Sequence, residues 1–337
     1  MRVLVTGGTG FLGSHCVEAL AAAGHDVRLL VRTPAKIAAT FDPLGVRIES
    51  HLQGDMADPQ AVDRALEGCD AVLHTAATMY GGADVLEANL AGVRNVIGGA
   101  VERGIDPPIY ISSVGAMFPP SGPVIRVDDP IGEHETVYGR SKAEGERYVR
   151  SLQAQGAAVT NIYPGGVYGP RDPVIGETMK GLRDAIRFGW PITTGGVSIV
   201  DARDVAHIVT ACLEPGRGPR RYMASGHFLT WSEFTDCCEM LTGKKMRRVP
   251  APPVVVRAFG RAIDVLQRLL PFFEYPLTHE AALFLTQLVP GDNSATEKDL
   301  GIEFRPTAET LSDSIRWLAE AGELGPKHAG RLAAEAP

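Results

Sequence analysis

The sequence "TGGTGFLG" at residues 6–13 joins a short β-branched run to a helical pattern and spaces its glycines as G-x-x-G-x-x-G. In such a loop one glycine makes a tight turn, one lets the backbone approach a diphosphate, and one lets the helix pack on the strand. The helix then presents free N–H groups and the positive end of its dipole to the phosphates. We therefore predict a nucleotide-binding loop made by Gly7, Thr9, Gly10, Phe11, Leu12 and Gly13.

Short apolar runs and helical patterns alternate on both sides of this loop. Strands are expected at 2–5, 26–31, within 46–55, 70–76, 108–113 and 158–163, and helices at 11–24, 59–66, 84–103 and 136–155. Strict alternation means parallel strands joined by helical crossovers, with both faces of the sheet covered. The predicted fold class is therefore α/β, with a doubly wound parallel sheet of the Rossmann type.

The pattern loosens after residue 164. We expect a loop at 164–173, a helix at 178–188, a strand and a helix within 198–214, a strand at 221–226, a helix at 231–243 and mostly helix from there to 321. The predicted organisation is an NAD(P)-binding domain, 1–167 with a returning segment 198–226, and a smaller, mostly helical substrate lobe, 168–197 and 227–325. Residues from 326 onward are small and polar and are expected to fray.

The composition is that of a globular protein, with 337 residues of which 45% are hydrophobic and 22% are charged. The net charge of −7 and the lack of a basic run argue against nucleic-acid binding, which needs clustered Lys and Arg. Five cysteines without C-x-x-C spacing predict reduced thiols in the cytoplasm and no metal site. The chain begins directly with its first strand, and no apolar run of about 18 residues predicts a membrane span. A surface contact with a membrane through 269–273 is the rarer alternative to an amphipathic core helix.

The end of the second predicted strand indicates which dinucleotide binds. An NAD site usually places Asp or Glu there to bond the ribose 2′-hydroxyl. This chain has Val31 there, followed by Arg32, Thr33 and Lys36. Two cations without a carboxylate suit a 2′-phosphate, so we expect NADP to bind at Arg32 and Lys36. If these are only solvated charges, NAD is the alternative.

Two further strand ends are expected to contact the cofactor. Asp55 can accept a hydrogen bond from the adenine amino group, and Met56 can lie against the ring. Asp55 could equally cap the next helix, which is a common role for Asp. Thr75, Ala76 and Ala77 follow the fourth strand, and their small side chains would let the backbone pass close to the cofactor.

Tyr138 and Lys142 lie four residues apart, which places them on one face of the predicted helix. A tyrosine phenol has a pKa of about 10, and a nearby ammonium favours the phenolate and lowers that pKa. Such a tyrosine can exchange a proton with a substrate oxygen while hydride moves at the neighbouring carbon. Ser113, at the end of the fifth strand, can donate to the same oxygen. An isolated Y-x-x-x-K is often accidental, but the glycine loop and the strand-end serine favour a catalytic role for all three residues.

The chain resembles the extended short-chain dehydrogenase/reductases, the epimerase/dehydratase-like superfamily, over roughly residues 2–320. The motifs that carry the resemblance are "TGGTGFLG", "GDMAD", "HTAA", "NLAGVRNV", "ISSVGAM", "YGRSK", "YPGGVYGPRD" and "VDARDVA". The resemblance implies that Ser113, Tyr138 and Lys142 are catalytic, and that Tyr138 and Lys142 also contact the cofactor. It implies further cofactor contacts from Asn89, Pro164 and Val167, although Asn89 could instead be a helix-surface residue.

Three departures from sugar-nucleotide enzymes make the chain look most similar to bacterial dihydroflavonol-4-reductase-like reductases. The second strand lacks its acid, no acid stands beside Ser113, and Tyr163 precedes Pro164 where UDP-sugar enzymes carry Asn. The resemblance implies hydride transfer between NADPH and a carbonyl or secondary alcohol. An NAD-retaining epimerase or a 3β-hydroxysteroid-type dehydrogenase is the alternative enzyme. Outside enzymes, the alternative is an NADP-sensing binding protein.

Aromatic residues are frequent in and near the predicted lobe and favour a hydrophobic substrate, although most can simply form its core: Phe118, Tyr168, Phe188, Trp190, Phe228, Trp231, Phe259, Phe272, Phe273 and Tyr275. Met117 and Tyr168 follow strand ends, so we expect them to line the substrate pocket. The resemblance also implies a homodimer, formed through the helices at 84–103 and 136–155.

Overall fold

The computed structural model describes residues 1–78, 83–270 and 277–333. Its largest sheet has seven strands in the order β10-β6-β5-β4-β1-β2-β3. All six pairings are parallel. The strands are β1 (Arg2–Thr6), β2 (Asp26–Val31), β3 (Ser50–Gln53), β4 (Ala71–His74), β5 (Pro108–Ile111), β6 (Thr160–Pro164) and β10 (Arg220–Ala224). This order confirms the predicted doubly wound sheet, because the chain fills one side of β1 and then the other.

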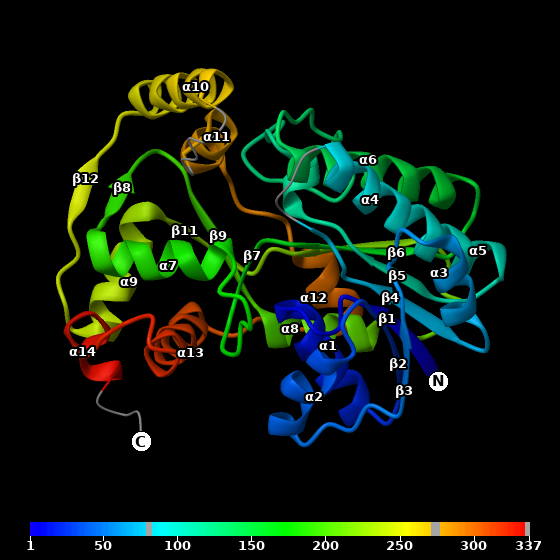
Figure 1. Cartoon of the computed structure of the whole chain (residues 1–337). Helices are drawn as coiled ribbons and strands as arrows, with labels where there is room; N and C mark the ends of the chain where they lie inside the picture. Colours follow the sequence, from blue (N-terminus) through cyan, green and yellow to red (C-terminus); the bar gives the residue numbers. More distant parts are fainter. Residues whose placement is uncertain (79–82, 271–276, 334–337) are drawn as a thin grey trace.

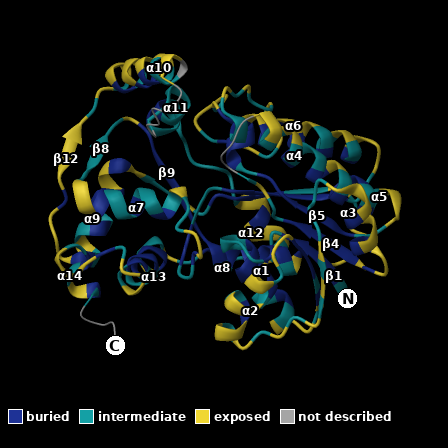
Figure 2. Cartoon of the chain, viewed as in Figure 1, coloured by how far each residue is buried: buried dark blue, intermediate teal, exposed yellow. Residues whose placement is uncertain are grey.

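Helices cover both faces of this sheet (Figure 1). On one face α1 (Phe11–Ala22) packs against α8 (Ala202–Ala211). On the other face α4 (Ala83–Val93) packs against α6 (Val137–Ala154), beside α3 (Pro59–Leu66). The central strands β1 and β4 are mostly aliphatic, which suits their burial on both faces; Figure 2 shows these strands buried.

A second group of elements lies beside the sheet, on the left of Figure 1. A three-stranded sheet joins β7 (Gly166–Tyr168), β9 (Gly196–Asp201) and β11 (His227–Thr230), and β8 (Trp190–Ile192) pairs with β12 (Arg248–Pro250). The helices are α7 (Glu177–Phe188), α9 (Trp231–Thr242), α10 (Pro253–Leu269), α11 (His279–Gln287), α13 (Thr307–Glu320) and α14 (Pro326–Ala329). α12 (Ser294–Leu300) instead contacts β10 and α8, at the main sheet.

The returning segment is only partly in the main sheet. Its first strand, β9, pairs with β7 and β11, whereas α8 and β10 belong to the seven-stranded sheet and its helical layer. The domain boundaries given above therefore stay a prediction. Among the described residues, no helix has both the length and the apolar character that crossing a bilayer requires.

Several local expectations differ from the structure. The helix expected at 84–103 is α-helical only to Val93, passes through a π turn at Arg94–Gly98 and ends in α5 (Gly99–Glu102). A Cβ at Gly98 would collide with the Tyr148 hydroxyl of α6, so glycine permits this close approach. The sequence pattern does not predict α2 (Ala35–Phe41), β8 or β12, and it places β7 in a loop.

The C-terminal residues also differ from the expectation. Residues 326–332 do not fray but form α14 and a short 3-10 turn, Gly330–Leu332. Ala329 and Leu332 are buried in the same hydrophobic cluster as Trp231 and Leu318, and this burial holds the segment in place.

Candidate active site

The glycine loop has the geometry that a dinucleotide needs. Gly7 has a φ of +76°, and a Cβ there would lie 2.6 Å from Thr75 Oγ1 and 2.7 Å from Ala76 N. A Cβ at Gly13 would collide with the carbonyl oxygen of Gly7, so α1 packs directly on the loop. At Gly10 the nearest atom to a Cβ is Gly7 O, at 3.2 Å, which leaves that side of the loop more open.

The N-terminus of α1 is also suited to binding the diphosphate of a dinucleotide. No side chain caps this helix, and its first turn contains no acidic residue. The N–H groups of that turn are therefore available for a diphosphate, together with the positive end of the helix dipole. Thr9 and Phe11 are partly exposed here, whereas Leu12 packs against the core. The residues present fit the predicted dinucleotide.

Asp55 and Met56 lie after β3, with contacts that the sequence did not reveal. Asp55 Oδ1 accepts a hydrogen bond from Ala57 N at 2.9 Å, and it is Asp58 that caps α3. The capping alternative for Asp55 is therefore wrong, and its adenine contact stays a prediction. The Met56 thioether lies against α4, where a Cβ at Gly92 would be 2.7 Å from the sulfur.

The segment after β4 passes close to the glycine loop. Thr75 Oγ1 donates to Thr6 O at 2.9 Å, so its side chain ties β4 to β1. The backbone of Ala76 lies against Gly7, and Ala77 is exposed. Small residues are needed here because the two loops leave little space between them.

Arg32 and Lys36 are both exposed, beyond the end of β2. Neither side chain has an ion-pair partner in the part of the chain that the structure describes. Arg32 contributes only its backbone oxygen, which accepts from Gln53 Nε2 at 3.4 Å. Both charges therefore remain available to bind an anion such as a 2′-phosphate.

Ser113, Tyr138 and Lys142 come together at the carboxyl end of β5. Ser113 caps the 3-10 turn Val114–Met117, where its hydroxyl accepts from Gly115 N at 3.0 Å, and its side chain acts to lower the pKa of the Tyr138 phenol. Tyr138 lies in the first turn of α6, and Lys142 follows one turn later. Lys142 Nζ lies 6.0 Å from the centre of the Tyr138 ring and donates to Ile111 O at 2.9 Å. The three predicted catalytic residues therefore lie together at one site.

Burial is the largest influence on the pKa values of Tyr138 and Lys142. It raises the pKa of Tyr138 above its ordinary value, although the hydrogen bond from Ser113 acts in the opposite direction. The expected lowering of that pKa by Lys142 is not borne out, because the ammonium is directed to a backbone oxygen instead. Burial also lowers the pKa of Lys142 to about 8, against the opposing effect of Glu146. At neutral pH Tyr138 is a neutral phenol that can donate a proton, and Lys142 is mostly charged.

Glu146, one turn after Lys142 on α6, joins this helix to the end of the neighbouring strand β5 and to β6. The sequence analysis did not predict this role. The Glu146 carboxylate is fully buried. It accepts four hydrogen bonds, at 2.7–3.0 Å, from Ser112 Oγ, Arg150 Nε, Asn161 Nδ2 and Tyr163 OH. The spacing could have indicated this residue, because an acid four residues after Lys142 lies on the same face of the helix.

His74 is a second buried group that the sequence reasoning left without a role. Its Nδ1 is hydrogen-bonded to Thr6 Oγ1, and its ring stacks on Tyr110 with centroids 5.9 Å apart. Burial lowers the pKa of His74 to about 3, and the charge of Lys142 adds to this effect. His74 is therefore neutral, and its ring packs against Tyr110 at the end of β4.

Asn89 joins the segment after β4 to the active-site helix. It is only 5% exposed, so the helix-surface alternative is wrong. Its amide accepts from Thr78 N at 2.9 Å and donates to Thr78 O at 2.8 Å and to Ser141 Oγ at 3.3 Å. Ser141 precedes Lys142 directly, so Asn89 fixes α6 relative to β4.

The four remaining predicted residues lie near the ends of β6, β7 and β5. Pro164 ends β6 and is buried, and Val167 lies in β7 against the main core. The structure does not support pocket-lining roles for Met117 and Tyr168, which are 1% and 5% exposed and belong to hydrophobic clusters. Strand-end position suggested these two, but packing against neighbouring apolar residues takes up their side chains.

Glu280 on α11 caps the active-site helix from outside the main sheet. Its carboxylate accepts from Thr136 N at 2.8 Å, Thr136 Oγ1 at 2.9 Å and Glu135 N at 3.2 Å. It also lies 3.2 Å from His134 Nδ1. Thr136 is the N-cap of α6, two residues before Tyr138. No local motif predicts this contact, because it joins residues 144 positions apart.

α11 also contacts the turn that follows Ser113. Phe284 stacks on Phe118, with ring centroids 4.0 Å apart and planes 13° from parallel. Phe118 is buried, like Trp231, whereas Phe188 and Phe259 are exposed. Phe272, Phe273 and Tyr275 lie outside the described residues.

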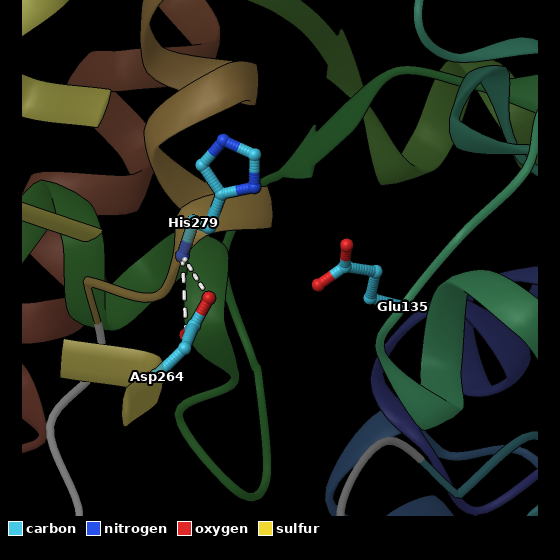
Figure 3. Close-up of side chains that lie close together, drawn as sticks. All are labelled: Glu135, Asp264 and His279. Carbon is cyan, nitrogen blue, oxygen red and sulfur yellow. Dashed lines mark hydrogen bonds between the residues drawn. The ribbon is translucent and has the colours of Figure 1, made fainter. Parts of the chain in front are cut away.

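Three potential metal ligands, Glu135, Asp264 and His279, lie together near this contact, as Figure 3 shows. One ligand atom of each falls within 4.8 Å of the others. The Asp264 carboxylate already accepts from His279 N, at 3.2 and 3.3 Å, and Arg261 Nε lies 3.2 Å from His279 Nε2. A guanidinium at the imidazole opposes a second cation, so this cluster is better described as the link between α10 and α11.

Comparison with known proteins places these features in context. The family model described as "NAD dependent epimerase/dehydratase family" matches residues 3–224. "Sterol demethylase protein B" of Methylococcus capsulatus is 29% identical over 96% of this chain and 100% of its own length. "2-alkyl-3-oxoalkanoate reductase" of Stenotrophomonas maltophilia is 34% identical over 70% of this chain and 74% of its own. The crystal structure of gox2253 superposes with a TM-score of 0.79 at 25% identity, covering 96% of this chain and 99% of that one.

Proposed function

Because the chain belongs to the NAD dependent epimerase/dehydratase family, we propose that it is an NAD(P)-dependent oxidoreductase that reduces a carbonyl group on a mostly apolar substrate. The placement of Ser113 at the end of β5 and of Tyr138 in the first turn of α6, with Lys142 Nζ 6.0 Å from the Tyr138 ring centre, is the observation that carries this proposal. Two adjacent hydroxyl donors at a strand end suit one developing alkoxide. Lys142, one turn along α6, supplies the nearby positive charge.

In the proposed reaction, Ser113 and Tyr138 hold the carbonyl oxygen of the substrate between their hydroxyl groups. When bound at the glycine loop, NADPH would supply the hydride for the carbonyl carbon. Tyr138 gives its phenolic proton to the oxygen as negative charge develops there, which completes the alcohol. The raised pKa of Tyr138 fits this direction, because the residue is fully protonated before the reaction. The Lys142 ammonium, 6.0 Å from the centre of the Tyr138 ring, is the nearby positive charge when the phenolate forms.

The proposed cofactor is NADP, with NAD as the alternative. The open side of Gly10 and the uncapped start of α1 support a diphosphate at the glycine loop. The exposed charges of Arg32 and Lys36, which no described acidic side chain pairs, support a 2′-phosphate beyond β2. No carboxylate stands at this position in the sequence to bond a free 2′-hydroxyl.

An apolar substrate is supported by the names of two similar proteins and by the partly exposed Phe284 near the catalytic residues. The names of the two relatives mention a sterol and a 2-alkyl-3-oxoalkanoate, which both contain extended hydrocarbon. In this chain the stacked rings of Phe118 and Phe284 lie beside the turn that follows Ser113. We therefore propose a ketone carried on a hydrocarbon skeleton, in preference to a sugar nucleotide.

A screen of the purified protein tests this function. Ketones, aldehydes, 3-oxo acids, sterols and sugar nucleotides are incubated with NADPH and NADH separately, and cofactor absorbance is followed. We expect oxidation of NADPH with apolar ketones and none with sugar nucleotides. Tightly retained cofactor with interconversion of sugar nucleotides would favour an epimerase instead. Tight NADP binding without turnover of any compound would favour a cofactor sensor.

A further inference from the structure

Helix α10 shows two different faces to its surroundings. Val256, Gly260 and Ile263 are buried toward α11, and a Cβ at Gly260 would lie 2.7 Å from Thr278 O. At 100° per residue, another set of apolar residues shares one arc of about 140°: Val254, Val255, Ala258, Phe259, Ala262, Val265, Leu266 and Leu269. We call this set the outer face of α10.

The outer face is solvent-exposed even though it is the more apolar side of the helix. Val254 is 74% exposed, Leu269 72%, Val255 61% and Val265 54%. Seven of the eleven strongly exposed large hydrophobic residues described in the chain lie within 249–270. Figure 2 shows α10 as an exposed helix at the edge of the molecule. Exposed apolar patches of this kind usually mark a surface that is covered in use.

Positive charge accompanies this apolar surface. Arg257 and Arg261 flank the outer face on one side, and Asp264, the acidic residue of α10, is already bonded to His279 N. Residues 244–270 contain seven Lys or Arg and one Asp, a net charge of +6 in a chain of net −7. The rest of the chain therefore carries −13. The sequence "KKMRR" at 244–248 is a short basic run, in which Lys245 and Arg248 form ion pairs with Glu239 and Asp236 of α9, while Lys244 and Arg247 are exposed.

We propose that the outer face of α10 docks on a lipid bilayer that contains anionic lipids. An amphipathic helix with an apolar face and a flank of basic residues lies in the plane of such an interface, with its apolar side among the acyl chains. Basic residues beside it are attracted to the negative surface potential. A second copy joined through the same face would add its own Arg257 and Arg261 to the interface, and these like charges repel. The bilayer therefore complements both the apolar side chains and the charge.

Docking would place the candidate active site close to the membrane surface. α10 packs on α11, and α11 contacts the active-site helix through Glu280 and the turn after Ser113 through Phe284. If the proposed function holds, a hydrophobic substrate can pass from the bilayer to the site behind this pair of helices. The docking itself does not depend on that function, so the two can fail separately.

Vesicle sedimentation with the full-length protein tests the docking. We expect the protein to sediment with vesicles of phosphatidylcholine and phosphatidylglycerol, and more weakly with phosphatidylcholine alone. Added salt should weaken the binding to the mixed vesicles, because it screens the surface potential. Sedimentation with neither kind of vesicle would overturn the proposal.

Substitutions separate the apolar contribution from the charge. Val255→Asp and Val265→Asp should each lower the binding constant for mixed vesicles on the order of tenfold, because a carboxylate resists burial among acyl chains. Arg261→Gln should lower it about fivefold for mixed vesicles and hardly at all for neutral ones. Met240→Asp, on the exposed side of α9, is the matched control and should bind like the wild type.

Two further readouts keep the result interpretable. Thermal melting by circular dichroism should be unchanged in Val255→Asp, since the side chain is exposed. Reduction of a water-soluble ketone, if the screen finds one, should also be unchanged. If Val255→Asp binds mixed vesicles as tightly as wild type, the outer face is not the docking surface and the proposal is wrong. If it instead converts a dimer to a monomer in gel filtration, a second copy covers the face and the proposal is again wrong.

Discussion

Glu280→Gln should impair catalysis from outside the catalytic trio. The Glu280 carboxylate accepts hydrogen bonds from the N–H and hydroxyl of Thr136, at 2.8 and 2.9 Å, and thereby holds the N-cap of α6. Tyr138 lies in the first turn of that helix, so its hydroxyl depends on this cap for its position. Burial alone would raise the pKa of Glu280, but hydrogen bonds from His134 and Thr136 outweigh it and leave the pKa lowered. The carboxylate is therefore charged at neutral pH, and its hydrogen bonds are charge-assisted.

The size of the effect follows from these contacts. The amide introduced by the substitution would keep one acceptor oxygen but would turn an NH₂ group toward a backbone N–H, which leaves that donor unpaired. Losing one charge-assisted hydrogen bond costs roughly 2 kcal/mol. If the first turn of α6 must be ordered for each turnover, this corresponds to about 30-fold in kcat. KM for the cofactor should change much less, because Glu280 bonds residues 134–136 and not the glycine loop.

Steady-state kinetics with the best ketone of the screen would measure this. Glu309→Gln, the same change in the first turn of α13, is the control and should keep wild-type kcat. The lowered pKa also predicts a stability effect, because Glu280 stabilises the fold above its ordinary pKa near 4.5 and less as pH falls below it. A variant with wild-type kcat and an unchanged melting temperature at pH 7 would refute the role given to Glu280.

Three other predictions concern charge, cofactor choice and assembly. Glu146→Gln removes the carboxylate that opposes the lowering of the Lys142 pKa to about 8, so the alkaline limb of kcat/KM should move to lower pH, on the order of one unit. Exposed Glu144→Gln is its control, and an unmoved limb would contradict the coupling. Arg32→Ala with Lys36→Ala should raise KM for NADPH on the order of tenfold and leave NADH nearly unchanged; equal effects on both cofactors would show that these cations do not read the 2′-phosphate. A homodimer through α4 and α6 should elute at twice 35.9 kDa in gel filtration, and elution as a monomer at micromolar concentration would count against it.

The main sheet was predictable because its signals are local and periodic. The apolar residues of the runs 2–5 and 26–31 are buried, and the glycines at 7, 10 and 13 serve the turn and the packing that their spacing indicates. The elements that the pattern missed are short or irregular. β8 and β12 have three residues each, and the π turn at 94–98 depends on how α6 approaches it.

The candidate site was predictable only in part. Ser113, Tyr138 and Lys142 follow from motif and spacing, and the structure brings them together. The direction of the Tyr138 pKa could not be predicted, because it depends on burial by residues far along the chain. The contact of Glu280 with Thr136 could not be predicted for the same reason, since only tertiary packing brings α11 to the start of α6.

The central claim is that Tyr138 gives the proton in a hydride-transfer reaction at the carboxyl end of β5. The most direct measurement is the rate of NADPH oxidation by Tyr138→Phe, together with its affinity for NADPH from fluorescence titration. We expect kcat to fall on the order of a thousandfold while the dissociation constant for NADPH stays nearly unchanged, because only the proton donor is lost. Retention of more than about a tenth of the wild-type kcat, with NADPH bound normally, would contradict the account.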